Sequence, residues 1–256
     1  MLMTMDVGNT NLKFGLWEDN ELFANWRVKS RSDISGDEVG FMLEGFLRLS
    51  GLSFSMIDDL VIASVVPPMR PSLERFAGKY LKKQAIFVES HSQKMMKLDY
   101  DNPREVGADR VVVSVAAWKR YRKSLVVVDF GTATTFDCVS GDGVYLGGAI
   151  SPGFRLSADA LTLRASLLPK LESFYVPTGA ICKDTVNCMN SGLVLGYTSL
   201  VEGMVKRISL EMASNPTVVA TGGLAALFAS LSDSIDAVHP DLTMEGLKII
   251  YDEKKW

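Results

Sequence analysis

The chain has 256 residues, which is enough for one large domain or two domains of ordinary size. Hydrophobic residues make up 47% of it and charged residues 22%, an ordinary composition for a soluble protein. The net charge of −3 excludes a broad electrostatic attraction to nucleic acid or to anionic membranes, so we expect neither as a partner.

Cysteine and histidine usage argues against a zinc protein. The three cysteines (Cys138, Cys182 and Cys188) and the two histidines (His91 and His239) lack the spacing of a metal cluster. An odd number of cysteines favours a reducing compartment, so we expect a cytoplasmic protein. We also expect no signal peptide, because no basic region and cleavage site are found, and no membrane span, because no apolar run approaches about 18–20 residues.

The first half of the chain has the predicted order strand, strand, strand, helix, strand, helix, strand. Hydrophobic residues alternate in the early strands and recur at helical spacing in the helices. The predicted elements are strands 1–7, 11–17 and 21–28, a helix 38–49 closed by Gly51, a strand 59–65, a helix from a Ser72 cap to about residue 82, and a strand 84–88. A three-strand meander followed by crossover helices and parallel strands is the order of a ribonuclease H-like half-domain.

A predicted helix at 111–119 leads to a second round of the same order. The further elements are strands 124–129, 134–140 and 143–150, a helix 155–168, one long helix or two over 184–213, a strand 217–220, a helix 224–230 and a closing segment 240–251. We therefore predict an α/β fold of two ribonuclease H-like half-domains, duplicated βββαβαβ units in residues 1–117 and 118–256, that face a central nucleotide cleft.

Two Asp-x-Gly turns each follow a buried strand and start a three-strand meander. They are Asp6-Val7-Gly8-Asn9-Thr10 and Asp129-Phe130-Gly131-Thr132. A tight glycine turn lets backbone N–H groups approach phosphate oxygens, and a carboxylate at a strand end can hold a hydrated cation. Lys13, just past the first turn, can point back to a phosphate. One copy alone is compatible with a plain hairpin, but two copies in equivalent places favour a nucleotide site.

The segment Gly107-Ala108-Asp109-Arg110 precedes the predicted helix 111–119. Arg110 at a helix N-terminus could hold a carboxylate, and Asp109 could accept a proton from a substrate hydroxyl. The local sequence slightly favours the alternative, in which Asp109 is an N-terminal cap beside an exposed Arg110.

Two glycine motifs complete the set of candidates. Gly147-Gly148-Ala149-Ile150-Ser151-Pro152-Gly153 indicates either a close backbone approach to a ligand or a sharp strand-to-helix turn. Thr221-Gly222-Gly223 follows a strand, and an adenine or ribose could lie on its glycine backbone. Each motif is weak when it is taken alone.

Together these motifs resemble the type III pantothenate kinases, which belong to the acetate and sugar kinase/Hsp70/actin superfamily. The matching segments run nearly end to end and comprise Asp6–Thr10, Tyr100 with Asn102-Pro103, Gly107–Arg110, Asp129–Thr135, Gly147–Gly153, Asp184-Thr185, Ala220–Gly223 and Asp241–Leu247. The resemblance implies ATP-dependent phosphorylation of pantothenate to 4′-phosphopantothenate, the first step of coenzyme A biosynthesis. The alternative is a kinase-like accessory regulator that binds nucleotide without this activity.

The resemblance also implies residue roles. Binding of ATP falls to Asp6, Val7, Gly8, Asn9, Thr10, Asn11, Leu12, Lys13 and Thr132, with Asp6 near Mg²⁺. Binding of pantothenate falls to Tyr100, Gly107, Ala108, Asp109, Arg110 and Thr185, with Asp109 as the proton acceptor. Asp129 is the ligand of a monovalent cation, K⁺ or NH₄⁺.

The resemblance further implies a homodimer in which Thr185 reaches the pantothenate site of the partner protomer. The segment before Thr185 departs from the family pattern, because Cys182 and Asp184 stand where the family usually has Gly and Asn. An additional carboxylate near an anionic substrate is unfavourable unless it points away from that substrate.

Overall fold

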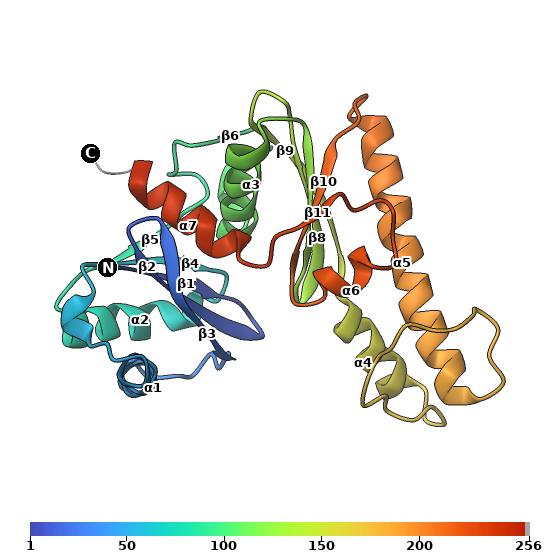
Figure 1. The fold of residues 1–256 in the computed structure, drawn as a ribbon, viewed down its shortest axis with the longest axis horizontal. Helices are drawn as coiled ribbons and strands as arrows, with labels where there is room; N and C mark the ends of the chain where they lie inside the picture. Colours follow the sequence, from blue (N-terminus) through green and yellow to red (C-terminus); the bar gives the residue numbers. More distant parts are fainter. Residues whose placement is uncertain (254–256) are drawn as a thin grey trace. The chain divides into compact units, whose positions relative to one another are not determined.

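The computed structural model describes residues 1–253 and divides into two compact units. The first unit comprises residues 1–120 together with the segment that begins at Asp241, and the second comprises residues 121–240. Figure 1 shows that each unit is built around its own β-sheet. Within residues 1–253, no helix is both long and apolar enough to cross a bilayer.

The sheet of the first unit has the strand order β3-β2-β1-β4-β5. Its strands are β1 (Leu2–Val7), β2 (Asn11–Glu18), β3 (Glu21–Lys29), β4 (Asp59–Ser64) and β5 (Ala85–Phe87). The first three pair antiparallel, and β4 and β5 join in parallel, as the sequence pattern predicted. The other elements of this unit are α1 (Gly36–Leu49), η1 (Phe54–Met56), η2 (Pro67–Met69), α2 (Arg70–Phe76), η3 (Ala77–Leu81), β6 (Lys97–Leu98), η4 (Pro103–Glu105), α3 (Ala108–Tyr121) and α7 (Leu242–Glu253).

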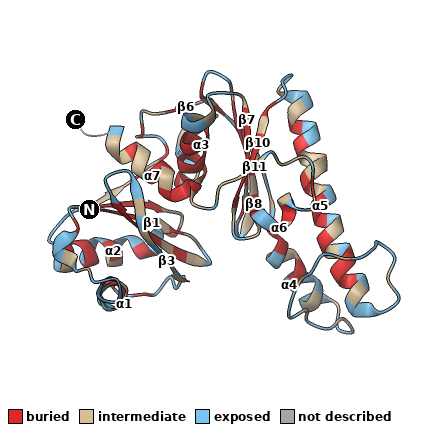
Figure 2. Ribbon diagram, in the orientation of Figure 1, coloured by how far each residue is buried: buried red, intermediate tan, exposed pale blue. Residues whose placement is uncertain are grey.

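One face of this sheet is the core face. Leu12, Phe14 and Leu16 of β2 are fully buried in a cluster that also contains Val39 and Leu43 of α1. The central strand β1 is buried along most of its length, as Figure 2 shows. Because side chains alternate along a strand, Asp6 and Lys13 project from the opposite face.

The helix α7 packs on β1 and β4 of the first unit, although it is the last element of the chain. The hydroxyl of Thr4 donates to the sulfur of Met244 at 3.2 Å. This helix therefore belongs to the first compact unit, whereas the expected domains 1–117 and 118–256 place it in the second domain. As a statement about the duplicated halves, the division at residues 117 and 118 stays a prediction.

The strands of the second unit repeat the order of the first, β9-β8-β7-β10-β11. They are β7 (Leu125–Phe130), β8 (Ala133–Val139), β9 (Val144–Pro152), β10 (Thr217–Gly222) and β11 (Ala237–Val238). The helices are α4 (Phe154–Arg164), α5 (Thr185–Glu211) and α6 (Ala225–Ala229). The region 184–213 thus forms one long helix, and its buried stripe packs against β7 and β8 (Figure 2).

Three helix boundaries were predicted wrongly. Ser72 lies inside α2 and does not cap it, because Pro71 occupies the first turn, where its missing N–H costs nothing. The helix expected to run to about residue 82 ends at Phe76 and continues as the π-helical turn η3. Likewise α4 ends at Arg164 and not at residue 168. Ala165 has extended backbone, and Pro169 disfavours helical backbone at residue 168.

Candidate active site

The first Asp-x-Gly turn joins β1 to β2 and is closed by its own backbone. The Gly8 N–H donates to the Asn11 carbonyl at 3.1 Å, and a Cβ on Gly8 would lie 3.2 Å from the same oxygen. The carbonyl of Thr10 accepts the Ser30 N–H at 2.9 Å, which ties the turn to the end of β3. Asn9 and Thr10 are exposed, so the turn can present backbone and side-chain polar groups to a ligand.

Asp6 and Lys13 lie directly opposite each other on β1 and β2 beside this turn. The Lys13 Nζ is 3.3 Å from the Asp6 Oδ2. Burial raises the pKa of the Asp6 carboxyl, and the charges of Lys13 and Arg27 oppose that shift. The pair offers one carboxylate for a hydrated cation and one ammonium group for a phosphate.

The start of α3 places Asp109 and Arg110 in the first helical turn. The Asp109 Oδ1 accepts the Arg110 backbone N–H at 2.8 Å, and a Cβ on Gly107 would lie 2.4 Å from that carboxylate oxygen. The Arg110 side chain is buried, with 8% of its residue surface exposed. The alternative of an N-terminal cap beside an exposed arginine is therefore wrong, since α3 already begins at Ala108.

Tyr100 lies in the loop that leads to α3 and is 37% exposed. Asn102 organises this loop, because its side-chain oxygen accepts the Arg104 N–H at 3.3 Å and its side-chain nitrogen donates to the Glu105 Oε1 at 2.7 Å. The first unit thus holds Tyr100, Asp109 and Arg110 on one short, internally hydrogen-bonded stretch of chain.

Two glycines contact the second Asp-x-Gly turn, Gly153 and Gly222, and each comes from one of the two glycine motifs. The Gly153 N–H donates to the Thr132 carbonyl at 3.1 Å, and a Cβ on Gly153 would lie 2.3 Å from that oxygen. A Cβ on Gly222 would lie 2.4 Å from the Asp129 Oδ1, and the φ of Gly222 is +92°, a conformation that favours glycine. Because Gly153 and Gly222 have no Cβ, the Thr132 carbonyl and the Asp129 carboxylate fit beside them.

Gly148 has a different role. A Cβ on this residue would lie 1.7 Å from the Phe136 carbonyl oxygen on the neighbouring strand β8. The close approach at this glycine is therefore a contact within the sheet, where β8 and β9 change register between Cys138 and Val139.

Thr185 is the first residue of α5 and is exposed. Asp184, the residue before it, is the N-cap. Its carboxylate accepts the Asn187 N–H at 2.9 Å and the Asn187 side-chain amide at 2.6 Å. The hydrogen bond from the Asn187 side chain, followed by that from its backbone, lowers the pKa of Asp184. The carboxylate that departs from the family pattern is thus directed at its own helix.

The carboxylates of the site suit a cation that keeps other ligands. Over residues 1–253, no group of three or more His, Cys, Asp or Glu side chains could by itself hold a metal ion. Mg²⁺ commonly binds through one or two carboxylates together with water and substrate phosphates. A single carboxylate such as that of Asp6 fits that mode, in which water and a bound phosphate supply the further oxygen ligands.

Comparisons with known structures support the fold. A putative Baf family transcriptional activator from Campylobacter jejuni superposes with a TM-score of 0.61 at 20% identity, covering 98% of both chains. Component A of (R)-2-hydroxyglutaryl-CoA dehydratase from Acidaminococcus fermentans gives a TM-score of 0.57 at 16% identity, covering 98% of this chain and 96% of the other. Together with the repeated strand order, this similarity confirms the predicted α/β fold of duplicated ribonuclease H-like halves.

Sequence comparisons identify the family of the chain. The family model for type III pantothenate kinase matches residues 2–207. The type III pantothenate kinase of Desulfatibacillum aliphaticivorans is 47% identical over 252 residues, which cover 98% of both chains. That of Anaeromyxobacter dehalogenans strain 2CP-C is 47% identical over 255 residues, which cover 100% of both chains. The chain belongs to the type III pantothenate kinase family.

Proposed function

We propose that this protein transfers the γ-phosphoryl group of ATP to the terminal hydroxyl of pantothenate, which forms 4′-phosphopantothenate and ADP in the first step of coenzyme A biosynthesis. The observation that carries the proposal is 47% identity to a type III pantothenate kinase over 98% of the chain. In this reaction the bond between the γ-phosphorus and the bridging oxygen breaks, a bond to the substrate oxygen forms, and the hydroxyl proton passes to a base.

In the proposed ATP site, the first turn binds the phosphates. Gly8 closes the turn, the exposed Asn9 and Thr10 supply hydrogen-bond donors, and Lys13 supplies a positive charge. Mg²⁺, when bound near Asp6, would neutralise the charge that develops on the phosphates. Phosphoryl transfer depends mostly on such positioning and charge neutralisation, which this cluster of polar groups is built to provide.

In the proposed pantothenate site, Asp109 accepts the proton of the attacking hydroxyl. The Asp109 carboxylate is oriented by the Arg110 N–H and by the space above Gly107, which supports a role that demands a fixed position. Arg110 binds the pantothenate carboxylate, since a buried guanidinium gains strongly from a charged partner. Tyr100 and Ala108 complete this part of the site.

We assign Asp129 as the ligand of a monovalent cation, K⁺ or NH₄⁺, and Thr132 as a contact to ATP. The support is the arrangement around the second turn, where Gly153 and Gly222 leave room for Thr132 and Asp129. A cation held by Asp129 would offset the repulsion between phosphate groups and carboxylates in the site. The placement of a nucleotide between the two halves stays a prediction.

We further infer a cytoplasmic homodimer in which Thr185 contacts the pantothenate bound by the partner protomer. Exposed apolar side chains in α4 and in the segment that joins it to α5 support an interface there, since Ile181 is 93% exposed, Leu167 is 95% exposed and Leu163 is 80% exposed. Asp184 does not oppose this role, because its carboxylate caps α5.

The test is turnover of purified protein with ATP, Mg²⁺ and K⁺, measured as pantothenate-dependent release of ADP. No such release across several K⁺ and NH₄⁺ concentrations would refute the proposal, and binding of ATP without binding of pantothenate would favour the accessory regulator. We expect Asp109→Asn to reduce turnover to a small residual rate and to leave ATP binding largely intact. The matched control is Asp233→Asn, at an exposed position that the site does not use.

A further inference from the structure

A row of charged side chains crosses the first sheet next to the first Asp-x-Gly turn. Lys13 on β2 lies opposite Asp6 on β1 and, on its other side, opposite Arg27 on β3. Directly opposed residues of antiparallel strands point to the same face. Trp26 and Val28, the neighbours of Arg27, pack against the core, so Arg27 projects from the face that carries Asp6 and Lys13.

Within this row, Lys13 does not by itself make the turn electropositive. Its ammonium lies 3.3 Å from the Asp6 carboxylate, so the two charges largely cancel for a ligand farther away. A nucleoside triphosphate is a polyanion and needs a net positive surrounding. Of the candidate ATP-binding residues, which are residues 6–13 and Thr132, Lys13 is the one with a positively charged side chain. Its charge is already paired with Asp6.

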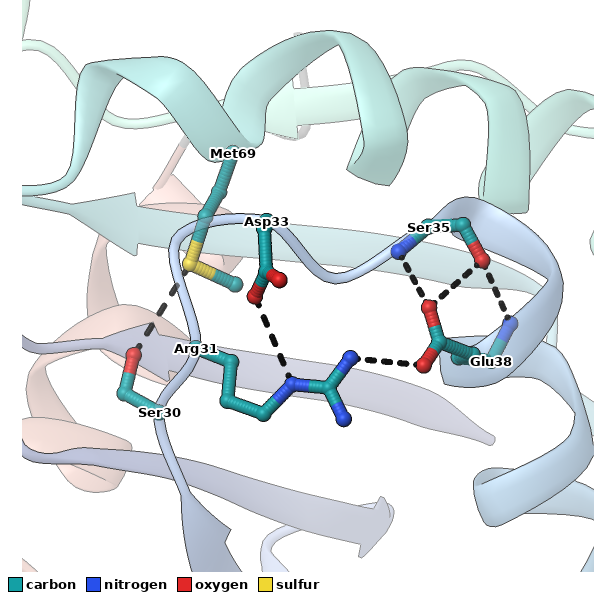
Figure 3. Close-up of polar contacts among 6 residues, drawn as sticks. All are labelled: Ser30, Arg31, Asp33, Ser35, Glu38 and Met69. Carbon is teal, nitrogen blue, oxygen red and sulfur yellow. Dashed lines mark hydrogen bonds and ion pairs between the residues drawn. The ribbon is translucent and has the colours of Figure 1, made fainter.

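The strand β3 supplies the missing charge. Arg27 and Lys29 alternate along it on the same face and are both exposed. Lys29 lies opposite Asn11, the residue that follows the turn. Arg31, the next basic residue, contributes less, because Asp33 accepts from its Nε at 3.4 Å and Glu38 accepts from a terminal nitrogen at 2.7 Å, as Figure 3 shows.

Arg27 is available for a ligand and is held in place by its backbone. Over the described residues 1–253, its guanidinium makes no hydrogen bond or ion pair. The end of β3 is fixed to the turn itself by the bond from the Ser30 N–H to the Thr10 carbonyl at 2.9 Å. The hydroxyl of Ser30 also donates to the sulfur of Met69 at 3.8 Å (Figure 3). The distance between the Arg27 backbone and the turn is therefore set by the sheet.

We propose that Arg27 is a phosphate-binding residue for the nucleotide, whose guanidinium contacts the polyphosphate chain held by the Gly8–Thr10 turn, and that Lys29 strengthens the attraction at longer range. The planar fork of an arginine can donate two parallel hydrogen bonds to one phosphate group, which a lysine cannot. This role extends the proposed kinase function, since it concerns the donor nucleotide and not the acceptor.

The experiment measures nucleotide binding by calorimetry in the absence of pantothenate, for the wild type, Arg27→Gln and Arg27→Lys. Arg48→Gln is the matched control, because Arg48 is an exposed arginine of α1, which packs on the core face of the sheet. We expect Arg27→Gln to weaken ATP binding about tenfold or more, the loss typical of one hydrogen bond between charged partners. Arg27→Lys recovers part of the affinity, and binding of adenosine, which has no phosphate, is unchanged.

Three further readouts separate phosphate binding from a structural role. In steady-state kinetics, Arg27→Gln raises the KM for ATP and leaves the KM for pantothenate and the kcat at saturating ATP within about twofold of the wild type. The salt dependence of ATP binding also becomes shallower, because one charged contact is lost. Melting temperatures of all variants should agree, since Arg27 is exposed.

Equal ATP affinity in Arg27→Gln and Arg48→Gln would overturn the proposal, and so would an equal loss of ATP and adenosine binding in Arg27→Gln. Because binding is measured without pantothenate, the outcome stands apart from the proposed function. Failure of the wild type to phosphorylate pantothenate counts against that function alone, and unchanged nucleotide binding in Arg27→Gln counts against Arg27 alone.

Discussion

Replacement of Gly107 by alanine tests the proposed base most directly, because it moves the Asp109 carboxylate without removing it. A Cβ at residue 107 would lie 2.4 Å from the Asp109 Oδ1, whereas an ordinary contact starts at 3.4 Å. The carboxylate must therefore retreat by about 1 Å, a displacement that typically costs about a hundredfold in rate. Gly107 has no positive φ, and the group it meets is the mobile end of a side chain, so the fold should tolerate the methyl group.

The assay compares kcat, ATP affinity and melting temperature of Gly107→Ala with those of the wild type. We expect kcat to fall about a hundredfold while ATP binding and melting temperature change little. Gly45→Ala is the matched control, since a Cβ there meets no atom within 4 Å. In the middle of α1 this control should stabilise the protein by up to about 1 kcal/mol and leave kcat unchanged.

A double variant decides whether the effect passes through the carboxylate. In the background of Asp109→Asn, where the base is already lost, Gly107→Ala should cause no further decrease of the residual rate. A full kcat in Gly107→Ala, or a decrease of the rate by the same factor in both backgrounds, would exclude an effect through the position of the Asp109 carboxylate.

Three other predictions concern the second turn, α5 and α1. Gly222→Ala places a Cβ 2.4 Å from the Asp129 Oδ1 at a residue with a φ of +92°. It should raise the K⁺ concentration for half-maximal activity at least about tenfold and destabilise the fold by about 1–3 kcal/mol. An unchanged K⁺ activation curve would argue against Asp129 as the cation ligand. Asp184→Asn retains an acceptor for the Asn187 N–H and should leave the KM for pantothenate unchanged, whereas Asp184→Ala lowers the melting temperature; a large change in KM for Asp184→Asn would show that this carboxylate acts on the substrate. Hydrogen bonds from Ser35, first from its backbone and then from its hydroxyl, lower the pKa of Glu38 from 4.5 to about 2. The stability that this carboxylate contributes is therefore present above pH 4.5 and is lost as the pH falls toward 2. Urea unfolding of Glu38→Gln between pH 2 and 6 should lack this part of the pH dependence, and a profile identical to that of the wild type would contradict the prediction.

The sequence by itself determined the order of the elements and the place of both Asp-x-Gly turns. These features depend on local chemistry, since alternating apolar residues specify a half-buried strand and glycine specifies a tight turn within a few positions. The capping residue of α1 could be read in the same way, because Ser35 and Glu38 form a capping box within four residues of chain (Figure 3). Where a local signal was misread, as at Ser72, a neighbouring proline had a stronger effect on the helix start.

Tertiary structure alone decided which distant residues meet. The strand register brings Arg27 beside Lys13, and the parallel pairing of β7 and β10 brings Gly222 beside Asp129. The packing of α3 buries Arg110, whereas the local sequence favoured an exposed arginine at this position. No periodicity or propensity encodes these contacts, because each depends on pairing between segments that are remote in sequence and on the burial that follows from it.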